Sequence, residues 1–263
     1  MKLWLAILIL ILSFQPQARA QSPSPGFDIV FDIDWTTFYS IKNPNDHQGD
    51  KQIRVVEDKA YRYTDFLPEM IEILMQRHPD VRISFFSGGT KSRNETLLSQ
   101  VHLSDGRSLL QVAHRVFSKE NLQVVSQDET LSFPSRFKKN LSLVMPEAAP
   151  SRTILIDDQT DFAVKPHKAV SALGIFDYFK SFDPSMAGKP YAPASFEAWS
   201  MERNKALLWL AMLDTALENA RVHGDLASEA QIQWNQRPQN RFTLEKGRAL
   251  IVRPKAPACG RVF

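Results

Sequence analysis

Residues 28–37 read Asp-Ile-Val-Phe-Asp-Ile-Asp-Trp-Thr-Thr, an apolar stretch that ends in two aspartates, Asp32 and Asp34. Such a run predicts a buried strand. Because alternate side chains of a strand lie on one face, the two carboxylates can point the same way from its carboxyl end, where open α/β sheets bind their ligands. Two carboxylates held together need a cation or a shared proton, and a hard ion such as Mg²⁺ is the simplest occupant.

Strand-like and helix-like patterns alternate downstream of this stretch. Strands are expected at residues 53–56, 61–63, 81–86, 153–156 and 169–176, and the first two of these can form a small hairpin or flap. Helices are expected at residues 66–78 after an Asp65 N-cap, and at 94–101, 108–117, 135–143 and 199–219. The alternation predicts an α/β fold with a doubly wound parallel sheet, a small flap or cap and a carboxyl-terminal helical extension. The extension is expected to pack back against the sheet layer or to form an appendage.

The first twenty residues have the pattern of a secretory signal peptide. Lys2 is followed by the apolar segment 3–14 and then by Ala18-Arg19-Ala20, a small-x-small cleavage site. An uncleaved anchor is the alternative, although the apolar segment is short for a bilayer span. We therefore expect a periplasmic or secreted protein with no membrane attachment after cleavage. The expected divisions are a signal peptide (1–20), a linker (21–26), a core with a small cap insert (27–190), and a helical extension with a polar tail (191–263).

The charge balance gives no indication of nucleic-acid binding. The chain of 263 residues carries 32 basic and 29 acidic residues, and removal of residues 1–20 leaves a net charge of about +1. Lone Cys259 cannot form an internal disulfide, and the six histidines show no pair at zinc-ligand spacing. No Gly-x-Ser-x-Gly elbow supports a serine hydrolase. Residues 88–92, Gly-Gly-Thr-Lys-Ser, lack the glycines of a P-loop.

Polar groups follow three of the expected strands. Asp32-x-Asp34 ends the first, Ser87 with Gly88 follows the strand at 81–86, and Asp157-Asp158 follows the strand at 153–156. A lysine pair, Lys138-Lys139, lies upstream of the third. Each group alone has an ordinary explanation as a turn, a helix cap or a solvated face. In a doubly wound sheet, however, these strand ends would converge on one crevice.

The order of these groups resembles the haloacid dehalogenase superfamily, whose four motifs run in the same sequence. Asp32-Ile-Asp34-Trp-Thr36 resembles the first motif, Ser87 the second, Lys139 the third and Asp157-Asp158 the fourth. The resemblance covers about residues 27–180. Within the superfamily, Phe-Asp-Ile-Asp is similar to the secreted bacterial acid phosphatases. The Lys-x-Leu-Ser and Ile-Asp-Asp-Gln stretches are similar to the phosphatases that act on the RNA polymerase carboxyl-terminal domain.

The resemblance implies a role for each acid and for the lysine. Asp32 would be the nucleophile that forms an aspartyl-phosphate, and Asp34 would be the general acid and base. Lys139 would offset phosphate charge, with Lys138 as the alternative for this position. The metal set would be Asp32, Asp34 (through its backbone carbonyl) and one or both of Asp157 and Asp158, and the cofactor would be Mg²⁺.

The resemblance also implies how a phosphoryl group would be bound. Ser87 and the backbone at Gly88 would bind its oxygens, and Thr36 would orient the loop after the first strand. Trp35 departs from the pattern, because many members carry Gly, Glu or Asp there, and this affects the substrate lid. The presence of Asp34 disfavours dehalogenation, since the dehalogenase members lack this aspartate.

These observations favour a Mg²⁺-dependent phosphomonoesterase that acts outside the cytoplasm on a phosphorylated substrate. Two alternatives are a non-catalytic binding or effector protein that keeps the fold, and a phosphotransferase that passes the phosphoryl group to an alcohol. Lids at residues 38–63 and 90–135 are expected to select the substrate, whose identity the sequence does not indicate. The oligomeric state is not indicated either.

Overall fold

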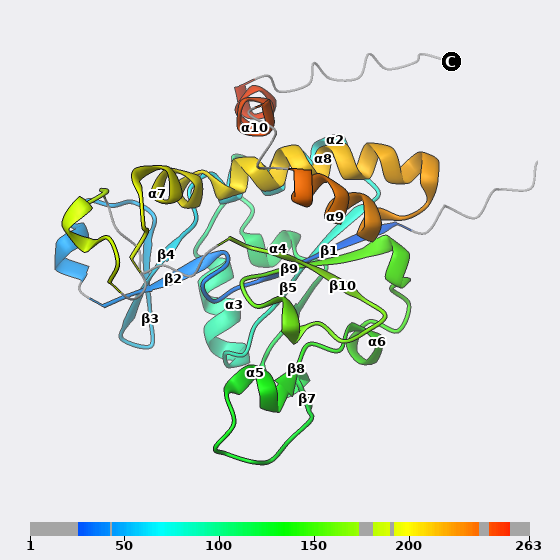
Figure 1. Ribbon diagram of the computed structural model, residues 1–263, viewed down its shortest axis with the longest axis horizontal. Helices are drawn as coiled ribbons and strands as arrows, with labels where there is room; N and C mark the ends of the chain where they lie inside the picture. The colour runs from blue at the N-terminus through cyan, green and yellow to red at the C-terminus, as the bar shows by residue number, and fades with distance from the viewer. Residues whose placement is uncertain (1–25, 43, 174–180, 190–191, 237–241, 253–263) are drawn as a thin grey trace, which may run out of the picture.

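A parallel sheet of five strands lies at the centre of the protein (Figure 1). The structure is a computed structural model, and it describes residues 26–42, 44–173, 181–189, 192–236 and 242–252. The expected signal peptide, Cys259 and all of the expected linker except Gly26 lie outside the described residues. None of the described helices is both long and apolar enough to cross a bilayer.

The strand order of the sheet is β10-β9-β1-β5-β6. The strands are β1 (Phe27–Asp32), β5 (Val81–Phe86), β6 (Arg115–Phe117), β9 (Thr153–Asp157) and β10 (Lys168–Ser171). All neighbouring pairs are parallel. From β1 the chain builds outward through β5 and β6, and it then crosses to β9 on the other side of β1. This reversal beside β1 is the position at which open α/β sheets form a ligand crevice.

Both faces of the sheet are covered, which confirms the predicted α/β fold. On one face, Phe31 of β1 packs against Trp209 of α8 (Lys205–His223), with ring centroids 5.8 Å apart. Helix α2 (Leu67–Arg77) packs on the same face. On the other face, Val30 and other apolar side chains of the sheet pack against the short helix α6 (Leu141–Val144) and the segments around it.

The structure describes further helices and one further pair of strands around these layers. The remaining α-helices are α3 (Lys91–Ser99), α4 (Leu109–Val112), α5 (Phe133–Arg136), α7 (Phe196–Arg203), α9 (Leu226–Gln236) and α10 (Phe242–Val252). The 3₁₀ helices are η1 (Pro44–His47), η2 (Lys119–Asn121), η3 (Pro150–Arg152), η4 (Thr160–Phe162) and η5 (Pro184–Met186). The strands β7 (Gln123–Val124) and β8 (Phe137–Lys138) form a small antiparallel pair.

The flap expected at residues 53–63 is present as an antiparallel sheet of three strands. Strands β3 (Ile53–Val56) and β4 (Lys59–Tyr63) form the predicted hairpin, and β2 (Phe38–Ile41) adds to its other edge. Glu57 and Asp58 form the two-residue turn, and both have positive φ, at 49° and 60°. That conformation matches the twist of a hairpin. The flap follows directly from the loop after β1, at the left of Figure 1.

All five helix predictions are wrong in part. The predicted helix 108–117 ends at Val112, and Arg115–Phe117 instead forms the edge strand β6, because Val116 pairs with Phe85 of the sheet. The predicted helix 135–143 is divided, because Phe137 pairs with Val124 in the β7–β8 ladder. Asp65 is not the N-cap of α2.

The start of α2 differs from its prediction because of a competing ion pair. Phe66 is the N-cap residue, with φ 64°, and no side chain caps the helix. The carboxylate of Asp65 instead accepts hydrogen bonds from Arg62 and Arg203. Similarly, α3 begins at Lys91, three residues before its predicted start, because the Thr90 side chain caps it.

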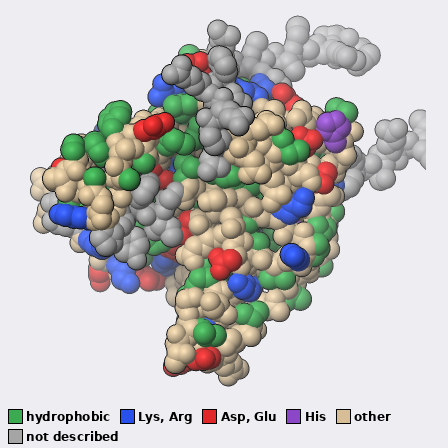
Figure 2. Space-filling view, in the orientation of Figure 1, with side chains coloured by type: hydrophobic (Ala, Val, Ile, Leu, Met, Phe, Trp, Pro, Cys, Tyr) green, Lys and Arg blue, Asp and Glu red, His purple; other side chains and the backbone are tan. Residues whose placement is uncertain are grey.

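The predicted helix 199–219 is two helices, α7 and α8, that meet at Asn204. Helix α8 is buried along most of its length and contributes to the central core. Helix α10 approaches it closely at Gly247, where an added Cβ would lie 2.1 Å from the carbonyl oxygen of Leu207. Exposed Phe196 of α7 stacks on Trp199, and hydrophobic side chains gather on the surface around this helix (Figure 2).

The buried carboxylate of Asp214 connects helices α2, α8 and α10. Asp214 of α8 accepts a hydrogen bond from Arg77 Nε of α2 at 2.6 Å, and its Oδ1 lies 2.9 Å from His78 Nε2. Lys246 of α10 pairs with Asp214 Oδ2 at 2.9 Å. Burial raises the pKa of Asp214, but the hydrogen bonds from His78, Arg77 and Lys246 outweigh it and hold this pKa below its usual range.

We expect Asp214→Asn to lower the free energy of unfolding by about 2 kcal/mol at pH 7, because it removes the buried anion that accepts hydrogen bonds from Arg77 and pairs with Lys246. The folded pKa of Asp214 lies below the unfolded value, so its contribution is fully present above about pH 4 and is lost as the pH falls below that. Urea unfolding at pH 7 and pH 3 measures both effects. Glu218→Gln is the control, because Glu218 also pairs with Arg77 but is half exposed. An equal loss in the two variants would contradict the assignment.

Candidate active site

The carboxyl ends of three neighbouring strands bring the predicted polar groups together. Asp32 is the last residue of β1 and lies beside Phe86, the last residue of β5, so Ser87 comes directly after that strand. Asp157 ends β9, on the other side of β1. All three side chains are buried. The parallel arrangement of β5, β1 and β9 therefore collects residues that are far apart in the sequence.

Lys139 is the lysine that faces the acids. Its Nζ donates hydrogen bonds to Asp32 Oδ1 and, at 2.7 Å, to Asp157 Oδ2, and its side chain is only 2% exposed. Lys138 points elsewhere, since its Nζ donates to the backbone oxygen of Asp161 at 2.6 Å. Burial alone would lower the pKa of Lys139, but the carboxylates of Asp157 and Asp32 raise it above its usual range. Lys139 is therefore held as a cation between two strands.

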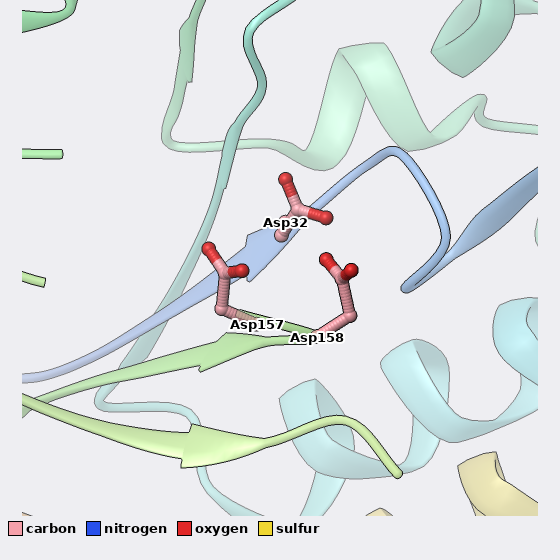
Figure 3. A group of neighbouring side chains, drawn as sticks. All are labelled: Asp32, Asp157 and Asp158. Carbon is pink, nitrogen blue, oxygen red and sulfur yellow. The ribbon is translucent and has the colours of Figure 1, made fainter. Parts of the chain in front are cut away.

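Asp32, Asp157 and Asp158 form a compact acidic group (Figure 3), in which one carboxylate oxygen of each lies within 4.8 Å of the others. Burial raises the pKa of Asp32 well above its usual range, and the charges of Asp157, Asp34 and Asp158 raise it further against the opposing effect of Lys139. Burial and the charge of Asp157 raise the pKa of Asp158 to about 6. One cationic side chain therefore does not compensate the negative charge of this group.

The acidic group fits a divalent cation. Asp32 Oδ2 is buried and accepts no hydrogen bond from any described residue. Hard cations such as Mg²⁺ take carboxylate oxygens of this kind as ligands and leave several positions to water or substrate oxygens. Of the predicted metal set, Asp32, Asp157 and Asp158 come together in this way. The carboxylate of Asp34 does not belong to the group.

Asp34 instead lines the cavity separately from this group, with its side chain 35% exposed. Arg93 Nη1 and Nη2 donate to its two oxygens, both at 2.7 Å, and Ser87 Oγ donates to Oδ2 at 2.6 Å. The Ser87 hydroxyl also accepts a hydrogen bond from the backbone N–H of Gly89 at 2.9 Å. Asp34 thus faces the same space as Asp32 but has separate partners.

Thr36 does not reach this space. Its side chain is fully buried, and its Oγ1 accepts a hydrogen bond from the backbone N–H of Asp158 at 3.0 Å. Its carbonyl oxygen accepts another from Thr64 Oγ1 at 3.1 Å. Thr36 therefore ties the loop after β1 to the end of β9 and to the start of α2.

These groups surround a cavity of about 310 Å³. Asp32, Asp34, Lys139 and Asp158 line it together with the predicted Gly88. Aromatic side chains complete its walls, namely Trp35, Phe133 and Phe162. Its size and mixed lining suit a phosphoryl group with part of a small organic leaving group.

Two functional residues were missed by the sequence analysis. Arg93 lies on the first turn of α3, six positions beyond Ser87, and no motif singles it out. The signal that could have found it is positional, because the first turn of a helix that follows a strand end faces the same edge of the sheet. The second residue, Lys205, lies far downstream and has no such signal.

Lys205 of α8 makes hydrogen bonds to the segment that follows β1. Its Nζ donates to the backbone oxygen of Trp35 at 3.3 Å and to the hydroxyl of Tyr39, and it pairs with Glu202 at 2.6 Å. Trp35 has φ 62°, a left-handed conformation that is unfavourable for a bulky residue. Burial lowers the pKa of Lys205, and the charge of Glu202 opposes this effect. The loop conformation therefore depends on contacts from the carboxyl-terminal helices.

The fold and the site together define a parallel α/β protein with a buried lysine and an acidic group at the carboxyl edge of its sheet. In this arrangement and in the order of its motifs, the chain resembles the phosphatases of the haloacid dehalogenase superfamily. No family model matches the chain, and no curated protein matches it.

Two solved structures to which the chain is similar are of the RNA polymerase II CTD phosphatase Fcp1. One is described as an essential CTD phosphatase, with 13% identity and a TM-score of 0.37, over 88% of this chain and 55% of that chain. The other is a variant of the fission yeast enzyme bound to beryllium fluoride, with 14% identity and a TM-score of 0.36, over 86% of this chain and 62% of that chain. The chain thus spans less than two thirds of either.

We expect Mg²⁺ to raise the unfolding temperature of the protein, because a ligand that binds only the folded state stabilises it by mass action. In Asp158→Asn, the same shift should need about tenfold more Mg²⁺, since one anionic oxygen of the acidic group is lost. Thermal unfolding across a Mg²⁺ series measures this shift. Asp161→Asn serves as the control, because this nearby aspartate is mostly exposed. Equal Mg²⁺ responses in the wild-type protein and Asp158→Asn would rule out the proposed ligand group.

Proposed function

We propose that the protein is a Mg²⁺-dependent phosphomonoesterase that hydrolyses a phosphate ester through an aspartyl-phosphate on Asp32. The observation that carries this proposal is the position of Asp32, which is buried against Lys139, belongs to the acidic group and faces the cavity. A second carboxylate, Asp34, lines the same cavity two residues later. Phosphoryl transfer requires positioning and charge neutralisation above all, and these residues supply both.

The proposed reaction has two displacements at phosphorus. In the first, a carboxylate oxygen of Asp32 forms a bond to phosphorus, the ester P–O bond breaks, and Asp34 gives a proton to the departing oxygen. In the second, Asp34 takes a proton from a water molecule whose oxygen attacks phosphorus. The bond between Asp32 and phosphorus then breaks, inorganic phosphate is released, and both aspartates return to their starting states.

The other residues of the site orient the reacting groups and offset the charge of the phosphoryl group. Lys139 fixes the orientation of Asp32 and offsets part of the phosphoryl charge. Asp32, Asp157 and Asp158 would hold the Mg²⁺ ion, which when bound neutralises the phosphoryl oxygens. Phe162 and Phe133 line the cavity and limit water around the reacting atoms.

Of the alternatives, a phosphotransferase differs only in its second step, in which an alcohol in place of water would attack phosphorus. Product analysis with excess alcohol separates the two, because transfer yields a new ester and hydrolysis yields only phosphate. A non-catalytic role is less well supported. Clustered carboxylates are costly without a cation to offset their charge, and in this group Asp32 and Asp157 are buried and Asp158 is partly buried.

We expect purified protein with Mg²⁺ to release p-nitrophenol from p-nitrophenyl phosphate, and EDTA to abolish the reaction. Asp32→Asn should lower kcat about a thousandfold or more, because an amide oxygen does not form the acyl-phosphate. Colorimetric assay of phosphate and p-nitrophenol measures both quantities. Lys138→Met is the control, because Lys138 lies beside Lys139 but contacts none of the acids of the site. Full activity in Asp32→Asn would refute the mechanism.

We also propose that the protein acts outside the cytoplasm, as a periplasmic or secreted enzyme. Support comes from the signal-like sequence of residues 1–20 alone.

Expression of the full chain in a bacterial host should place activity in the periplasmic fraction, with a processed amino terminus near Gln21. Mass spectrometry of the purified protein identifies this terminus. A matched chain that starts at Gln21 should stay in the cytoplasm. Retention of residues 1–20 on a membrane-bound product would support the uncleaved anchor in place of secretion.

A further inference from the structure

Arg93 is the second cationic side chain on the wall of the cavity. The first, Lys139, is almost fully buried and gives its hydrogen bonds to Asp32 and Asp157. The side chain of Arg93 is 13% exposed, and it lies on the same wall as Asp34. Arg93 is therefore the cation of the cavity wall that an incoming anion can reach.

Hydrogen bonds to neighbouring side chains hold the guanidinium of Arg93 in place. Its Nε and Nη2 donate to Asn94 Oδ1 at 3.1 and 2.7 Å, and Nη2 donates to Ser87 Oγ at 2.8 Å. Asn94 is itself buried and donates to Ser118 Oγ at 3.0 Å. The ring of Tyr61, from the flap, lies 5.7 Å from the guanidinium carbon. These contacts come from three separate parts of the chain.

Gly89 leaves the space that the guanidinium of Arg93 occupies. A Cβ at residue 89 would lie 2.0 Å from Arg93 Nη2, so any other residue would push the guanidinium out of its place. The φ angle of Gly89 is not in the left-handed region, so its requirement is one of space. The turn after β5 thus leaves room for an arginine at the cavity wall.

The negative charge of the carboxylates that line the cavity explains why a cationic side chain is needed there. The carboxylates of Asp32, Asp34 and Asp158 line the cavity, and a phosphoryl dianion that entered would be repelled by them. A guanidinium presents paired N–H groups whose spacing matches two phosphoryl oxygens as well as it matches a carboxylate. In the structure Asp34 accepts both of these N–H groups. A phosphoryl group and the Asp34 carboxylate would therefore compete for the same two N–H groups of Arg93.

We propose that Arg93 binds the phosphoryl group of the substrate, and that this exchange releases Asp34 to transfer protons. The inference rests on the proposed phosphatase activity and assigns a substrate-binding residue to it. On binding, two phosphoryl oxygens take the place of the Asp34 carboxylate on the N–H groups of Arg93, while Asn94 and Ser87 hold the guanidinium. The freed Asp34 carboxylate takes up a proton from solvent, which it then gives to the leaving oxygen. Release of phosphate, with return of one proton from Asp34 to solvent, restores the pairing with Arg93.

The test compares Arg93→Met and Arg93→Lys with the wild-type protein at saturating Mg²⁺. We expect Arg93→Met to raise both KM for p-nitrophenyl phosphate and the inhibition constant of inorganic phosphate by about tenfold to a hundredfold. Arg93→Lys keeps the positive charge but loses the paired N–H groups, so it should raise KM and the inhibition constant of phosphate severalfold. Arg82→Lys is the matched control, because Arg82 makes the same two-bond contact with an aspartate, Asp28, away from the cavity.

The result that overturns the inference is an unchanged inhibition constant of phosphate in a folded Arg93 variant. A purely structural role would lower the unfolding temperature or kcat and leave that constant within about twofold of wild type. If Arg93→Met does not fold, Arg93→Lys decides by the same criterion. If the wild-type protein hydrolyses no ester, the proposed function fails separately. Calorimetric titration with inorganic phosphate then decides whether Arg93 binds the anion.

Discussion

The buried ion pair that joins Lys139 to Asp32 and Asp157 is the contact on which the site depends. Neither partner is stable alone in this position, because an isolated buried ammonium or carboxylate is costly. The lysine comes from the irregular segment after β8, and the aspartates end two adjacent strands. The pair therefore fixes a segment outside the main sheet against the sheet's carboxyl edge. It also leaves a surplus of negative charge, which accounts for the affinity we assign to a cation.

The features that the sequence predicts well are those encoded by continuous runs. Strands β1, β5 and β9 are each an apolar stretch that ends in a polar group, and this pattern alone indicates burial, direction and the edge at which the side chains meet. Elements set by distant pairing are not encoded in this way. Arg115–Phe117 continues a helix-like pattern and becomes a strand only because β5 offers an unpaired edge.

The same distinction applies to the site. Asp32, Asp157 and Asp158 follow strands, and Lys139 lies in a motif, so sequence order identifies them. Lys138 and Lys139 are adjacent and of the same type, and they differ only in the direction of their side chains, which the sequence does not encode. Arg93 and Lys205 were not predicted, since their roles depend on the partners Asp34 and Trp35, from which they are separated by long stretches of chain. Residues defined by long-range contacts have no local signature.

The contact of Lys205 with the loop after β1 has a consequence for biosynthesis. The sheet strands β1, β5 and β9 are all complete by Asp157, so a growing chain can begin to collapse around them before α8 is made. The strained turn at Trp35 receives its buried ammonium only after α8 has been translated and has docked. The loop after β1 therefore gains this support late in synthesis, and a nascent chain halted before residue 205 would contain Asp32, Asp157 and Lys139 but lack the contact that holds the backbone at Trp35.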